Sequence, residues 1–189
     1  MLDKCTAIVM ATDKAWIERC KKLAHTAGFE ETYGFLGVDD IARRVRKTPV
    51  QFLFAHYELG EDVLRETMIA IRHHHERDVK FMPMVVFTKD QSVASLKHFL
   101  KMGFDDIVAF PCAMTHLVGR LELQLDRKLD YFQAGDYFGP DRRRLMEEDE
   151  DYRRERRAGG TYTHFVIQRD IEHGVRILHQ KQEHARESA

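Results

Sequence analysis

Several side chains in this sequence could take part in chemistry, and the histidines offer the most options. The run His73-His74-His75-Glu76 contains imidazole groups, which suit zinc or nickel, and His73 and Glu76 stand three residues apart. Adjacent residues on a helix point in different directions, so the three imidazoles do not converge on one ion. We therefore interpret this run as a solvated helix end and expect no metal site.

Cysteine chemistry is not indicated either. Cys5, Cys20 and Cys112 are scattered and form no C-x-x-C pair, which argues against a disulfide framework and a thiolate zinc site. No feature of the sequence calls for a cofactor. The first apolar run is too short for a signal peptide or a membrane span, so we expect a cytoplasmic protein that makes no membrane contact.

Any functional side chains must be positioned by elements that alternate regularly along the chain. Short apolar runs predict strands at residues 7–11, 32–38, 50–55, 82–87 and 107–110. Helical spacing predicts helices at residues 13–27, 39–46, 61–76, 92–102 and 113–129. Five such units predict a parallel sheet with helices on both faces and with Phe52 and Phe87 in the core. Sheets of this kind place their functional site beyond the carboxyl ends of the strands.

Three segments carry a resemblance to the receiver domains of two-component response regulators, over roughly residues 5–128. Val85-Val86-Phe87-Thr88 resembles the family's fourth strand with its switch residue. The stretch 101–108 resembles the helix end and Asp pair before the fifth strand, and Phe110-Pro111 resembles the Lys-Pro turn after it. The resemblance implies a flavodoxin-like, doubly wound α/β fold with five parallel strands in the order 2-1-3-4-5.

The departures from the family matter as much as the matches. The family's phosphorylation site uses an acidic pair for Mg²⁺, an acceptor Asp after the third strand and a Lys after the fifth strand. Here Asp13 is the one carboxylate directly after the first strand, and Ala55 or His56 stands at the acceptor position. Phe110 replaces the Lys, and only Thr88 matches the switch residue. Aspartyl phosphorylation at the usual place is therefore not expected.

Each remaining candidate also has a simpler interpretation. His56 could accept a phosphoryl group itself, but the missing Lys and acidic pair would be wanted for that chemistry too. We favour a polar strand end without a special task, and Glu58 in the next loop is a poor substitute acceptor. Asp13 fits a helix N-cap better than a lone metal ligand. Thr88 could sense a neighbour, or it could simply end a strand.

The rest of the chain has a different composition. We divide the chain into a receiver-like domain (1–130), a charged linker containing aromatic residues (131–160) and a C-terminal amphipathic segment (161–189). The segment 137–144 resembles a Tyr-Phe-Gly-Pro-Asp-Arg-Arg-Arg tail of receiver-like proteins of α-proteobacteria. Approximate helical spacing predicts one apolar helical stripe, formed by Phe165, Ile167, Ile171, Val175 and Leu178. The residues expected to bind a partner are Tyr137, Phe138, Arg142, Arg143, Arg144, Phe165, Ile171 and Val175.

These features predict a non-catalytic, phosphorylation-independent signalling adaptor rather than an enzyme. Its expected partners are other signalling proteins, such as a kinase or a regulator, or a second copy of the chain. The alternative is an unorthodox phosphorelay response regulator that uses His56. A DNA-binding role is not favoured, because 30 basic residues balance 31 acidic ones and no helix-turn-helix pattern is present. Since five helices already cover the sheet, removing residues 159–189 is expected to leave a folded core that no longer assembles.

Overall fold

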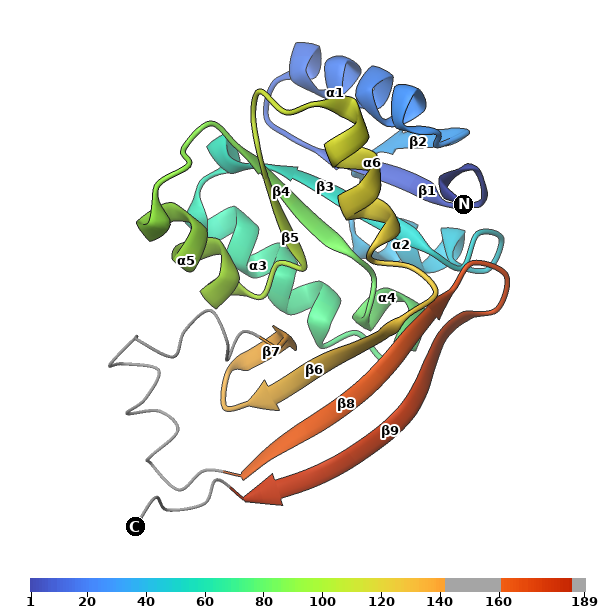
Figure 1. Ribbon diagram of the computed structural model, residues 1–189, viewed down its shortest axis with the longest axis vertical. Helices are drawn as coiled ribbons and strands as arrows, with labels where there is room; N and C mark the ends of the chain where they lie inside the picture. Colours follow the sequence, from blue (N-terminus) through green and yellow to red (C-terminus); the bar gives the residue numbers. More distant parts are fainter. Residues whose placement is uncertain (142–160, 185–189) are drawn as a thin grey trace.

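The computed structural model describes residues 1–141 and 161–184, which form two sheets (Figure 1). The first sheet is parallel, with the order β2-β1-β3-β4-β5, as predicted. Its strands are β1 (Thr6–Met10), β2 (Glu31–Gly34), β3 (Gln51–His56), β4 (Met84–Thr88) and β5 (Asp106–Ala109). The helices are α1 (Lys14–Ala27), α2 (Val38–Arg44), α3 (Glu61–Arg72), α4 (Arg77–Lys80), α5 (Val93–Met102) and α6 (Met114–Glu122). Short 3-10 turns, η1 (Leu2–Lys4) and η2 (Tyr57–Leu59), complete this part of the chain.

Both faces of the parallel sheet are covered, because its strands are apolar on both sides. Helices α1 and α6 pack on one face, and α2, α3 and α5 pack on the other. Phe52 and Phe87 are fully buried, as predicted. No helix among the described residues has the length and the apolar composition needed to cross a membrane.

Helix boundaries follow the capping residues where the sequence supplies them. The Asp13 side chain accepts a hydrogen bond from the Ala15 amide at 2.9 Å, and Gly28 ends α1 in the left-handed conformation. The helix predicted over 113–129 is too long, because α6 ends at Glu122. The chain turns at Asp126, which has a positive φ of 48° and donates its amide hydrogen to the Arg169 carbonyl. Likewise, α3 ends at Arg72 instead of continuing to Glu76.

The C-terminal segment forms strands, so the predicted helix is wrong. A second sheet, β7-β6-β8-β9, is antiparallel. Its strands are β6 (Lys128–Ala134), β7 (Tyr137–Pro140), β8 (Thr161–Asp170) and β9 (Gly174–His184). A tight turn joins β8 to β9, in which the Asp170 carboxylate accepts the amides of Glu172 and His173, each at 2.9 Å. The prediction of a linker is also wrong for residues 131–140, which form β6 and β7, and residues 142–160 of that linker lie outside the described ones.

The second sheet packs on its own chain, against the amino-terminal ends of β4 and β5 (Figure 1). One face contributes to a third apolar cluster, formed by Phe81, Tyr131, Phe138, Phe165, Ile167 and Val175. Three of the expected partner-binding residues, Phe138, Phe165 and Val175, are therefore buried inside the chain, which contradicts their assignment to a partner. Ile171 packs against the core beside α1 and α6. Arg142, Arg143 and Arg144 lie outside the described residues.

Candidate functional site

The five predicted site residues all lie at or after the carboxyl ends of the parallel strands. Asp13 follows β1, Ala55 and His56 end β3, Thr88 ends β4 and Phe110 follows β5. Because the strands are parallel, these ends lie together at the carboxyl end of the sheet, with His56 opposite Phe87 and Thr88 opposite Ala109. The structure thus brings these five positions together beyond the carboxyl ends of the parallel strands.

His56 is packed between aromatic rings. Its ring centroid lies 4.1 Å from that of Trp16 on α1 and 4.9 Å from that of Tyr57. The side chain is buried, and Nδ1 lies 3.8 Å from a Glu58 carboxylate oxygen. Burial lowers the pKa of His56 below its ordinary value of 6.5, although the Glu58 charge acts in the opposite direction. The neutral imidazole is therefore the favoured form at neutral pH.

This burial predicts a pH dependence of stability. The unfolded chain binds a proton at His56 near pH 6.5, whereas the folded chain binds it only at lower pH. The free energy of unfolding should therefore fall as pH decreases from about 7.5 to about 5.5, with a contribution of at most ~1.4 kcal/mol per pH unit from this group. His56→Phe keeps an aromatic ring beside Trp16 and should flatten this slope in urea unfolding.

The control for this experiment is His75→Phe, because the His75 side chain is 82% exposed. It should leave the slope as in the wild type. Equal slopes for the wild type and His56→Phe would mean that His56 is not held neutral by the fold.

Phe110 completes an aromatic cluster with Trp16, His56 and Phe87. Its ring stacks on that of Phe87 with centroids 5.1 Å apart and an interplanar angle of 13°. Phe87 also contacts Trp16 edge-on at 6.0 Å. Phe110, at the position where the resemblance to receiver domains would place a Lys, therefore contributes a stacked aromatic ring and no positive charge.

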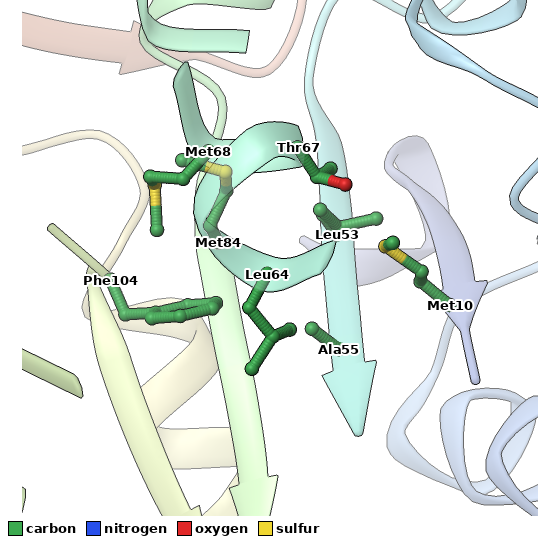
Figure 2. A pocket seen from close by; sticks show the side chains of 8 residues that line it. All are labelled: Met10, Leu53, Ala55, Leu64, Thr67, Met68, Met84 and Phe104. Carbon is green, nitrogen blue, oxygen red and sulfur yellow. The ribbon is translucent and has the colours of Figure 1, made fainter. Parts of the chain in front are cut away.

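Ala55 faces hydrocarbon on the other side of the sheet. It lines a narrow cavity between α3 and the strands (Figure 2). The other lining residues are Met10, Leu53, Leu64, Thr67, Met68, Met84 and Phe104. The space between these side chains is too narrow to hold a water molecule. A carboxylate at this position would lack both water and a cation.

The two remaining polar positions are used for local structure. The buried Thr88 hydroxyl accepts a hydrogen bond from the Asp90 amide at 3.0 Å, which closes the turn after β4. Asp13 caps α1, as predicted. Within residues 1–141 and 161–184, no group of three or more His, Cys, Asp or Glu side chains could hold a metal ion. At the histidine run, His74 Nδ1 accepts the Glu76 amide at 3.1 Å.

A groove that the sequence did not predict runs along β5, the edge strand of the parallel sheet. It lies between α5 and α6 and has a volume of about 440 Å³. Its lining residues are Gln91, Leu96, Ile107, Val108, Ala109, Pro111, Cys112, Ala113, His116, Leu117 and Arg120. Arg120 pairs with Asp106, which holds α6 beside the start of β5. The groove was not visible in the sequence because residues from two helices and a strand form it together.

A buried polar network at the opposite end of the sheet was also missed. The Asp105 carboxylate, whose side chain is 2% exposed, accepts hydrogen bonds from Arg72 and Arg169, each at 2.6 Å. It also accepts bonds from the Tyr131 hydroxyl and from the Met84 amide. Burial would raise the pKa of Asp105, but Arg169 and Arg72 together hold that pKa below its ordinary value. This network joins the two sheets, so we expect it to stabilise their packing against each other.

No model of a protein family matches this sequence, and no curated protein matches it. Among solved structures, a protein described as pilus assembly-related from Burkholderia pseudomallei is 15% identical, with a TM-score of 0.51, covering 65% of this chain and 90% of its own. The chemotaxis response regulator CheY4 of Vibrio cholerae is 13% identical, covering 63% and 97%, with a TM-score of 0.47. A two-component response regulator from Clostridium difficile is 16% identical, covering 63% and 93%, with a TM-score of 0.46. At such identities the likeness shows the fold alone, which is the flavodoxin-like fold of receiver domains.

Proposed function

We propose that this protein is a non-catalytic, phosphorylation-independent signalling adaptor of a two-component type of pathway. The observation that carries the proposal is the aromatic cluster of Trp16, His56, Phe87 and Phe110 at the receiver-like site. Phosphoryl transfer needs cations and hard oxygen ligands around the phosphoryl group. This cluster supplies neither, although all five parallel strands of the surrounding sheet are present in the order of the receiver fold.

The groove between α5 and α6 is the surface that we propose for partner binding. It has the mixed character of a recognition site, with apolar residues such as Leu96 and Ile107 beside the polar side chains of Gln91, His116 and Arg120. It also lies along a strand edge, where a partner can follow the sheet. The proposed partners are other signalling proteins, such as a kinase or a regulator.

The alternative function is a phosphorelay that uses His56 as the acceptor. The observation in its favour is the Glu58 carboxylate near His56 Nδ1, which could orient the ring. The buried position of His56 against the Trp16 ring argues against it, because an attacking nitrogen needs access to the phosphodonor.

One experiment separates these two functions. The full chain is incubated with a small phosphodonor and Mg²⁺ and is then analysed by intact-mass spectrometry under conditions that preserve acyl phosphates and phosphohistidine. We expect no phosphate adduct on the wild type or on His56→Gln. A stoichiometric adduct on the wild type that is absent from His56→Gln would contradict the adaptor proposal and support the relay.

Partner capture tests the groove itself. His116→Glu introduces a negative charge into the groove, and Thr115→Glu introduces the same charge on an exposed neighbour outside it. For a signalling protein captured by the wild type, we expect His116→Glu to weaken binding about tenfold, as is common for a disturbed interface centre. Thr115→Glu and added phosphodonor should change little. Capture that depends on phosphodonor, or that both variants weaken equally, would refute this use of the groove.

A further inference from the structure

Strand β9 has an open edge. Within the described part of the chain, β8 pairs with one side of β9 and no strand pairs with the other side. The strand is 11 residues long and contains no proline. Long edges of this kind offer a row of main-chain donors and acceptors to another strand. The opposite edge of the same sheet is different, because β7 has only four residues and ends at Pro140.

Apolar side chains on β9 also remain uncovered. Ile177 and Leu178 are 40% and 44% exposed, although they belong to a sheet whose inner face is packed. Burying such side chains favours association by roughly 25 cal/mol for each Å² removed from water. At the start of β9 the Val175 amide donates to the Asp78 carboxylate on α4 at 2.6 Å, so this end of the edge is covered. Beyond Val175, the edge combines main-chain groups that no strand pairs within the described residues with apolar surface.

A bulge fixes which side chains of β9 share a face. Val166 pairs with His179, but Ile167 pairs with Ile177, so Leu178 is an extra residue in β9. Residues an odd number apart would otherwise point to opposite faces of the strand. Because of the bulge, Arg176 and Glu183 lie on the same face.

This arrangement of charges is self-complementary. Consider a second β9 that runs antiparallel to the first, with Gln180 of one copy opposite Gln180 of the other. The bulged Leu178 is left out of the count, so Arg176 and Glu183 each lie three paired positions from Gln180. Arg176 of each copy then lies opposite Glu183 of the other. Residues directly opposite each other in an antiparallel pair must point to the same face of the sheet. Arg176 and Glu183 meet this condition because of the bulge. The two-fold axis that relates the copies then repeats the Arg176–Glu183 ion pair on both sides of Gln180, as in any symmetric dimer interface.

We propose that two copies of this chain pair through the open edges of β9 and join their four-stranded sheets into one. The pairing satisfies the main-chain groups of the edge beyond Val175, whose amide is already bonded to Asp78, and covers Ile177 and Leu178. The order of charges favours a second copy over an unrelated strand. The inference goes beyond the proposed adaptor function and does not depend on it.

The test measures self-association of the full chain by sedimentation velocity over a range of concentrations. The wild type should reach a dimer. Arg176→Glu and Glu183→Arg each place like charges opposite one another in both halves, and each should weaken the dimer about tenfold. The double variant restores opposite charges and should recover the wild-type affinity. Arg65→Glu is the matched control, because its side chain is 53% exposed against 50% for Arg176.

Three outcomes would overturn the proposal. A wild type that remains monomeric at every concentration excludes the pairing. If hydrogen exchange then finds the β9 amides protected in the monomer, another part of the same chain occupies the edge. A dimer that neither reversal weakens uses another surface. Loss of the dimer in both single variants without recovery in the double variant excludes this register.

Discussion

Arg169→Met is expected to lower the free energy of unfolding by about 3–5 kcal/mol, the usual result of breaking a buried ion pair. The Arg169 guanidinium is fully buried and donates to the Phe81 carbonyl at 2.7 Å and to Asp105 at 2.6 Å. It also donates to the Gln124 side chain at 2.9 Å. Methionine retains the aliphatic length but supplies none of these donors.

The loss should be large because Asp105 needs both of its arginine partners. With Arg72 alone, the buried carboxylate loses part of the charge that offsets its desolvation. The buried oxygens of the Phe81 carbonyl and the Tyr131 hydroxyl also lose a donor. A typical domain is stable by only about 5–15 kcal/mol, so a substantial part of the total depends on this side chain. Urea unfolding followed by circular dichroism measures the difference.

Two comparisons make this measurement decisive. Arg65→Met removes an exposed arginine from α3 and should change stability by less than about 0.5 kcal/mol. Asp105→Ala combined with Arg169→Met should cost less than the sum of the two single changes, because both remove the same interaction. A loss below about 1 kcal/mol for Arg169→Met would mean that the network does not hold the two sheets together.

The parallel sheet was predictable from the sequence because its signals are local. Its buried strands are short, continuous apolar runs, and Gly28 and Gly103 end helices where the periodicity stops. Strand order was available only through the resemblance to receiver domains, since periodicity does not encode which strands are neighbours. The aromatic cluster needed coordinates, because Trp16 reaches His56 from a helix far along the chain.

The C-terminal strands were missed for a specific physical reason. The inward positions of β8 alternate as Phe165, Ile167 and Arg169, and the last of these is charged. A buried arginine hides the period of two, while the spacing of four between Ile167, Ile171 and Val175 imitates a helix. Only the partner carboxylate, Asp105, explains why an arginine occupies an inward position, and it lies 64 residues away.

The strands β8 and β9 are expected to be required for folding, which reverses the expectation drawn from the sequence. Truncation from Gly159 removes Arg169 and uncovers Phe81, Tyr131 and Phe138. It also leaves β6 paired with β7 alone, and an isolated two-stranded hairpin is marginal in water. We expect the truncated chain to lose its cooperative unfolding transition and to aggregate.

The control truncation removes only residues 185–189 and deletes none of the contacts named above. It should unfold at the same urea concentration as the full chain. Near-UV circular dichroism and a urea titration of both truncations show whether β8 and β9 are required for folding or are dispensable for it. If the chain ending before Gly159 retains a cooperative transition near that of the full chain, then the second sheet is an appendage. In that case the network around Asp105 contributes little, and the stability of the core rests on the parallel sheet and its own helices.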